Sequence, residues 1–133
     1  MSHRETIAVI DYGSQYSQLI TRRVRECNVY CEMLPWDAPV ELLDALNPRG
    51  IILSGSPALA SQGDEGGYDP AIFDLDVPIL GFCSGHQEIA RHYGGRIEHT
   101  AREYGPATLR LTGATPIFAT LPEQQVVWMS HGD

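Results

Sequence analysis

The sequence contains 133 residues, 43% of them hydrophobic and 20% charged, which is the composition of one globular domain with a single core. A net charge of −8 and a pI near 4.9 argue against nucleic acid as a partner, because no basic field exists to hold phosphates. No apolar run approaches the roughly 20 residues of a membrane span, and no secretory segment opens the chain. We therefore expect a cytoplasmic protein that does not bind membranes.

The three cysteines are irregularly spaced, which suits a reducing compartment better than a disulfide framework. Cys27 and Cys31 have the close spacing of metal ligands, but the sequence offers no second pair to complete a site. We therefore expect these two thiols to be structural and predict no metal site.

Strand-like and helical segments alternate over the first 95 residues. Short apolar runs predict buried strands at residues 7–10, 29–34, 50–53 and 77–82. Helical spacing and helix boundary residues predict helices near residues 16–27, 40–46 and 84–93. In the first helix we expect an apolar stripe to face the core, made of Tyr16, Leu19, Ile20, Val24 and Cys27.

This alternation predicts an α/β fold of three layers (α/β/α), with a flavodoxin-like, mostly parallel sheet and helices on both faces. The polar, glycine-rich stretch 58–70 is expected to be a surface loop. After Gly95 the pattern changes to antiparallel strands near residues 107–112 and 125–129. We see no repeat or linker, so residues 1–133 are predicted to form one domain. A doubly wound domain normally continues past a polar turn like 130–133, so we expect this one to be partial, incomplete at its C-terminus.

The turn between the fourth strand and its helix reads Gly81-Phe82-Cys83-Ser84-Gly85. Gly-x-Cys-x-Gly at such a place is the thiol form of the nucleophile elbow, in which glycines permit close backbone approach and the nucleophile is exposed at the sheet edge. The helix N-terminus can also stabilise negative charge on an oxyanion. A buried structural cysteine is the alternative. From this motif alone the two interpretations are about equally supported.

Residues 81–87, Gly-Phe-Cys-Ser-Gly-His-Gln, resemble the Gly-x-Cys-x-Gly-x-Gln signature of class I glutamine amidotransferases. Three further segments resemble the GMP synthase branch of that family, namely residues 11–26, 29–37 and the closing Val-Trp-Met-Ser-His-Gly-Asp of 127–133. Residues 102–105, Arg-Glu-Tyr-Gly, resemble another family segment. The likeness extends from about residue 7 to residue 133.

The resemblance implies that Cys83 attacks the side-chain amide of glutamine, forms a glutamyl thioester and releases ammonia. In the family, ammonia passes to an ATP-pyrophosphatase synthetase domain, absent from this sequence, which uses ATP and Mg²⁺ to aminate xanthosine monophosphate to GMP in purine biosynthesis. That domain can lie in the same chain or in a second polypeptide, and the full-length protein is expected to be a homodimer. The glutaminase domain itself needs no cofactor, and no loop here has a phosphate-cradling pattern.

The resemblance also assigns roles to individual residues. The backbone N–H groups of Ser56 and Ser84 correspond to the oxyanion hole. Gly81 and Gly85 are the structural glycines of the elbow. The positions that correspond to the family's glutamine-binding residues are Gly55, Gln87, Ser130, Gly132 and Asp133.

The sequence departs from the family pattern at three places. Ser56 replaces a usual glycine, although Pro57 already favours an extended residue 56. Ser84 replaces a usual aromatic residue and His86 a usual methionine; one turn after the cysteine, His86 is not placed as a general base.

The third departure is that the family's catalytic His-Pro-Glu motif lies beyond residue 133. We therefore expect this fragment to be inactive alone. The alternatives are a non-catalytic glutaminase-like module that binds or regulates a partner, and an unrelated thiol hydrolase with the same elbow.

Overall fold

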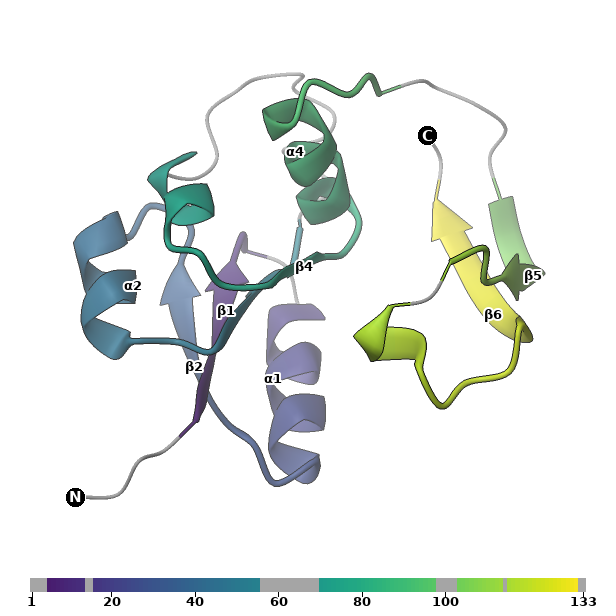
Figure 1. Ribbon diagram of the computed structural model, residues 1–133, viewed down its shortest axis with the longest axis horizontal. Helices are drawn as coiled ribbons and strands as arrows, with labels where there is room; N and C mark the ends of the chain where they lie inside the picture. The colour runs from purple at the N-terminus through teal and green to yellow at the C-terminus, as the bar shows by residue number, and fades with distance from the viewer. Residues whose placement is uncertain (1–4, 14–15, 56–69, 98–102, 114, 132–133) are drawn as a thin grey trace. The chain divides into compact units, whose positions relative to one another are not determined.

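The structure is a computed structural model that describes residues 5–13, 16–55, 70–97, 103–113 and 115–131 (Figure 1). Its chain divides into two compact units, residues 1–97 and 98–133. The single domain over residues 1–133 expected from the sequence stays a prediction. The stretch 58–69 of the expected surface loop lies outside the described residues.

A four-stranded parallel sheet forms the centre of the first unit, in the order β2-β1-β3-β4. The strands are β1 (Thr6–Asp11), β2 (Tyr30–Pro35), β3 (Gly50–Leu53) and β4 (Ile79–Gly81). All four confirm strands expected from apolar runs. β4 is shorter than the predicted 77–82, because Pro78 has no N–H to donate, although its carbonyl accepts the N–H of Ile51 at 2.9 Å.

Helices cover both faces of this sheet, as the sequence predicted (Figure 1). They are α1 (Tyr16–Glu26), α2 (Val40–Leu46), the short 3₁₀ helix η1 (Pro70–Asp74) and α4 (Ser84–His92). On one face, Ala8 and Ile10 of β1 pack with Leu43 of α2. On the other face, α1 packs against β1 and β2, and the Cys31 thiol donates to the carbonyl of Thr21 at 3.4 Å.

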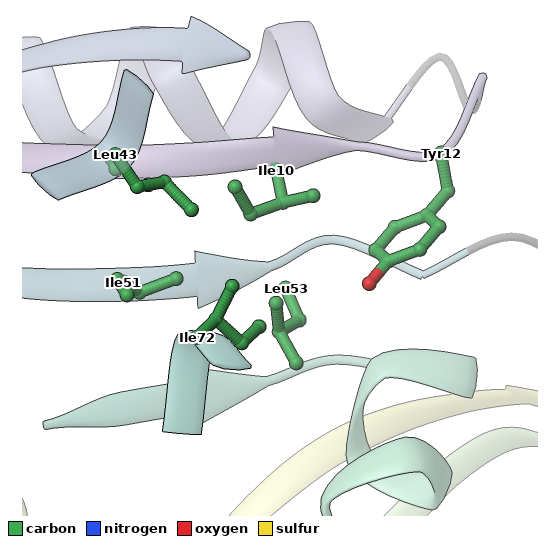
Figure 2. Close-up of a cluster of buried hydrophobic side chains, with 7 residues drawn as sticks. Ile10, Tyr12, Leu43, Ile51, Leu53 and Ile72 are labelled. Atoms are coloured by element: carbon green, nitrogen blue, oxygen red, sulfur yellow. The ribbon is translucent and has the colours of Figure 1, made fainter. Parts of the chain in front are cut away.

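The main core lies on the α2 face, between β1, β3 and η1 (Figure 2). Alternate residues of each strand point into it, because successive side chains of a strand point to opposite faces. Its buried members are Ala8, Ile10, Tyr12, Leu43, Ile51, Leu53 and Ile72. Ile89 of α4 packs against this cluster, so the core also supports the helix that follows the cysteine.

The prediction that an apolar stripe of α1 faces the core is wrong. Tyr16 and Leu19 are 53% and 50% exposed, and Cys27 is exposed as well. The buried residues of this helix are Ser17 and Thr21, one turn apart. Small hydroxyl side chains let the helix approach the sheet, and hydrogen bonds compensate for their burial. Ile20 and Val24, at the edge of the buried face, are only half-buried.

The second unit contains the antiparallel pair β5 (Glu103–Arg110) and β6 (Gln124–His131), with η2 (Pro116–Phe118) between them. The change to antiparallel strands after Gly95 is thus confirmed, with longer strands than expected. In its register, Pro106 lies opposite Trp128 and Tyr104 opposite Ser130. Within the described part of the chain, no helix has the length and apolar character needed to cross a membrane.

Candidate active site at the strand-to-helix turn

Cys83 occupies a sharp turn between the end of β4 at Gly81 and the start of α4 at Ser84. Its backbone has φ 56° and ψ −123°, a conformation that side chains other than glycine rarely adopt. The turn is closed by hydrogen bonds from the N–H of Gly85 to the carbonyl of Phe82 (2.9 Å) and from the N–H of His86 to that of Cys83 (3.0 Å). The thiol is exposed. The sequence-predicted elbow therefore has the strained backbone and the accessible nucleophile that define such turns.

The two flanking glycines lie where a side chain would not fit. A Cβ on Gly81 would lie 2.7 Å from the backbone nitrogen of His86 and from the backbone carbon of Gly85. A Cβ on Gly85 would lie 2.5 Å from the carbonyl oxygen of Leu53, in the neighbouring strand β3. Both contacts are with backbone, which cannot move aside cheaply, so the turn requires glycine at both positions.

The loop after β3 lies directly against the elbow. Gly55 has φ +78°, and a Cβ built on it would lie 2.3 Å from the carbonyl oxygen of Phe82 and 2.9 Å from the amide nitrogen of Ser84. The N–H of Phe82 also donates to the carbonyl of Leu53 at 2.9 Å, which continues the strand pairing into the turn. The two loops are therefore in backbone contact at the carboxyl edge of the sheet, where open α/β folds bind ligands.

The first turn of α4 offers hydrogen-bond donors next to the thiol. Ser84, 2% exposed, is the first helical residue, and its N–H directly follows Cys83. A helix N-terminus favours negative charge through its aligned dipoles and N–H groups. Gln87 lies one turn further along and is half-buried. A nucleophilic sulfur beside such donors can form a covalent adduct with a carbonyl carbon while the carbonyl oxygen becomes anionic.

A chain of hydroxyl groups, which the sequence analysis missed, lies behind the loop after β3. Ser54 donates from its Oγ to the carbonyl of Ile10 at 2.7 Å, and its Oγ lies 2.9 Å from the Oγ of Ser17. Ser17 also donates to Oδ1 of Asp11 at 2.7 Å. Ser54 and Ser17 are 3% and 0% exposed. The only sequence signal was the position of Asp11 and Ser54 at the ends of adjacent strands.

The structure brings together Cys83, Ser84, Gln87 and the glycines at 55, 81 and 85, all in the first unit. Ser130 lies in β6 of the second unit. Three predicted site residues lie outside the described residues: Ser56, Gly132 and Asp133. His86 is exposed on α4. Among the described residues, no group of three or more His, Cys, Asp or Glu side chains could hold a metal ion.

A parallel α/β sheet whose fourth strand turns sharply into a helix at an exposed cysteine defines a thiol-nucleophile enzyme of the elbow type. The sequence profile of one such family, described as glutamine amidotransferase class-I, matches residues 8–133. The chain belongs to this family.

Its similar curated proteins are GMP synthases of the glutamine-hydrolysing kind. The chain is 51% identical over 132 residues to that of Syntrophomonas wolfei and 48% identical over 130 residues to that of Bacillus subtilis. These alignments cover 98% and 97% of the chain but only 26% and 25% of the relatives. The chain thus spans about a quarter of the length of the curated relatives it matches.

Solved structures give the same fold. A GMP synthase component from Thermoplasma acidophilum superposes with a TM-score of 0.81 at 32% identity and covers 99% of this chain and 67% of its own. A glutamine amidotransferase from Thermotoga maritima superposes with a TM-score of 0.69 at 18% identity, over 98% of this chain and 62% of its own. The second likeness concerns the fold alone. Together they support the flavodoxin-like arrangement expected from the sequence.

Proposed function

We propose that this chain is the glutaminase part of a GMP synthase, which hydrolyses glutamine through a thioester on Cys83 and supplies the ammonia. The observation that carries the proposal is the exposed thiol of Cys83 at a turn of φ 56°, with the N–H of the first residue of α4 beside it. The names of the relatives support glutamine as the substrate. The reaction can be followed atom by atom at this turn.

In the first half-reaction, the Cys83 thiolate attacks the amide carbon of the glutamine side chain. A carbon–sulfur bond forms, and the carbonyl electron pair moves onto oxygen. The N–H of Ser84 donates to this oxyanion, and the N–H of Ser56 is the second proposed donor. When the carbonyl re-forms, the carbon–nitrogen bond breaks and ammonia leaves after taking up a proton. Donors fixed before the reaction lower its barrier because they need no reorganisation.

In the second half-reaction, water attacks the thioester carbon, the carbon–sulfur bond breaks, and glutamate leaves the regenerated thiol. Both halves need a group that moves protons. The resemblance places it in a His-Pro-Glu motif, which the 133-residue sequence does not contain. We propose that glutamine is held by five residues of this chain, mainly through backbone groups: Gly55, Gln87, Ser130, Gly132 and Asp133.

The ammonia is proposed to reach an ATP-pyrophosphatase synthetase domain, in the same chain or in a second polypeptide, that aminates xanthosine monophosphate to GMP. ATP and Mg²⁺ act in that domain. The glutaminase chemistry derived above uses only a thiol, backbone donors and water, so no cofactor takes part in it. We further propose that the full-length protein is a cytoplasmic homodimer.

A chloroketone analogue of glutamine tests the assignment, because an attacking sulfur displaces its chloride and keeps a mass tag. Treated with one equivalent, the full-length gene product should carry a single adduct on Cys83, located by mass spectrometry of its peptides. Cys83→Ala should abolish both the adduct and ammonia release from glutamine. Cys27→Ala is the matched control: Cys27 is also an exposed thiol but lies at the end of α1, so this variant should keep wild-type activity.

Absence of an adduct and of ammonia release from the intact protein would contradict the proposal. A glutaminase-like module that binds glutamine or a partner without hydrolysing it would then be the better description. Calorimetry with glutamine would separate those two alternatives, because only a glutamine-binding module would give a heat of binding.

A further inference from the structure

Three polar side chains from three separate segments form a continuous buried chain, defined here as the hydroxyl chain: Asp11, Ser17 and Ser54. They come from the end of β1, the buried face of α1 and the residue after β3. The oxygen–oxygen distances are 2.7 Å between Asp11 Oδ1 and Ser17 Oγ, and 2.9 Å between Ser17 Oγ and Ser54 Oγ. The chain ends on the carbonyl of Ile10, 2.7 Å from Ser54 Oγ.

Ser54 is thus held from two directions. Its backbone N–H donates to the carbonyl of Ile10 at 3.2 Å, and its side chain bonds to that same carbonyl and to Ser17. Two hydroxyl hydrogens serve the three contacts of the hydroxyl chain. Loss of either hydroxyl therefore leaves a buried acceptor without its donor, and the surrounding backbone must shift to solvate it.

The next residue, Gly55, carries this constraint to the elbow. Its Cα lies so close to the turn that an added Cβ would fall 2.9 Å from the amide nitrogen of Ser84 and 2.3 Å from the carbonyl oxygen of Phe82. A displacement of Ser54 therefore moves backbone that touches the donor proposed for the oxyanion. Such displacements matter because an error of about 1 Å in a reacting geometry can cost roughly 100-fold in rate.

We propose that Ser17 and Ser54 are positioning residues for the oxyanion site: the hydroxyl chain fixes the backbone of Gly55 against the amide of Ser84. This inference rests on the proposed glutaminase function. It also accounts for the buried face of α1, where Ser17 is fully buried while Leu19 is 50% exposed. The helix uses its contact with the sheet edge to hold the loop after β3, and an apolar side chain at residue 17 could not do so.

The test compares two reactions of Cys83 in the full-length gene product carrying Ser17→Ala or Ser54→Ala. Glutamine hydrolysis develops an oxyanion, and kcat should fall about 10- to 100-fold, below the roughly 100- to 1000-fold loss of a whole donor. KM for glutamine should stay within about twofold, because the affected interaction is made in the transition state. Alkylation by iodoacetamide, in which the sulfur displaces iodide from a tetrahedral carbon without forming an oxyanion, should keep its wild-type rate.

Thr21→Val is the matched control. Thr21 is buried on the same helix, and its Oγ1 donates to the carbonyl of Ser17 at 2.8 Å, outside the hydroxyl chain. This variant removes one buried hydroxyl from α1 at nearly constant shape, and kcat should not change. The double variant Ser17→Ala/Ser54→Ala should lose about as much kcat as either single variant, because the two hydroxyls act as one unit.

Wild-type kcat in Ser54→Ala would overturn the inference, as would a parallel fall in the alkylation rate, which indicates general damage to the fold. If the unmodified protein releases no ammonia, the proposed function itself fails. Hydrogen exchange then decides the structural part separately. Ser54→Ala should accelerate amide exchange at residues 82–85 relative to Thr21→Val, and unchanged exchange there would refute the positioning role without reference to catalysis.

Discussion

The backbone of Cys83 is strained by its own side chain. A residue other than glycine at φ 56° and ψ −123° costs about 1–3 kcal/mol, and the surrounding turn must hold it there. We therefore expect Cys83→Gly to be more stable than Cys83→Ala by about 1 kcal/mol, since glycine adopts this conformation without strain. Urea unfolding of the two thiol-free variants measures the difference. Equal stability would show that the turn relaxes when the sulfur is removed.

Gly55 is expected to tolerate no side chain, because it combines a positive φ with backbone on all near sides. Gly13 provides a matched control: its φ of +85° is similar, but no atom lies within 4 Å of an added Cβ. Gly13→Ala should cost about 1–2 kcal/mol from backbone conformation alone. Gly55→Ala should cost roughly 2–5 kcal/mol, because the contact of 2.3 Å with Phe82 adds packing strain.

Urea unfolding compares the two variants, and the iodoacetamide rate of Cys83 shows whether the elbow moved. Gly55→Ala should change that rate and Gly13→Ala should not. Equal effects of the two substitutions on stability would mean that the loop after β3 does not press against the elbow as the structure has it.

At the scale of elements, α1 shows how an amphipathic pattern can mislead. Its apolar residues recur at helical spacing, yet the sheet contacts a stripe of small hydroxyl residues displaced from them. We expect Leu19→Ala to cost less than about 1 kcal/mol, because the side chain is half exposed. Leu43→Ala in α2, where the leucine is 1% exposed, should cost about 2–5 kcal/mol. Thermal or urea unfolding compares them, and similar costs would restore the apolar stripe to the core.

The two ends of α4 differ in how far the sequence predicts them. The glycine pair at its C-terminus predicted the stop, and the structure has the expected geometry. Gly94 has φ +83° and donates to the carbonyl of Arg91, and Gly95 donates to that of Ala90 at 2.7 Å. The N-terminal end was predicted from two glycines and a cysteine. Its contact with Gly55 was not, because that contact depends on how β3 and β4 pair.

For the molecule as a whole, local pattern predicted the four parallel strands, and residues 40–46 and 50–53 were assigned with their observed bounds. Such segments carry their own signal in apolar runs and helix ends. Three features carried none: η1, the buried face of α1 and the hydroxyl chain. Ser17 and Ser54 are 37 positions apart, and no periodicity links them. Their contact follows from the order of strands, which places the ends of β1 and β3 side by side.

The last prediction concerns the chemistry that the 133-residue chain can perform by itself. The elbow, the first turn of α4 and the loop after β3 all lie within it, so a folded chain should still react with the chloroketone analogue at Cys83. A His-Pro-Glu motif is absent from the sequence, and loss of a general base typically costs about 10²–10⁴-fold in rate. We therefore expect ammonia release to be slower by about that factor than in the full-length gene product.

Ammonia release per folded molecule is the measurement, and circular dichroism with a cooperative urea transition shows that the chain is folded. Cys83→Ala in the same chain fixes the background rate. A folded chain that matches the full-length product would show that residues 1–133 already contain a base, and the exposed His86 on α4 would be the first residue to test. A folded chain that releases ammonia slowly, yet labels at Cys83, would place nucleophile and base in different parts of the protein, so that hydrolysis would depend on their being brought together.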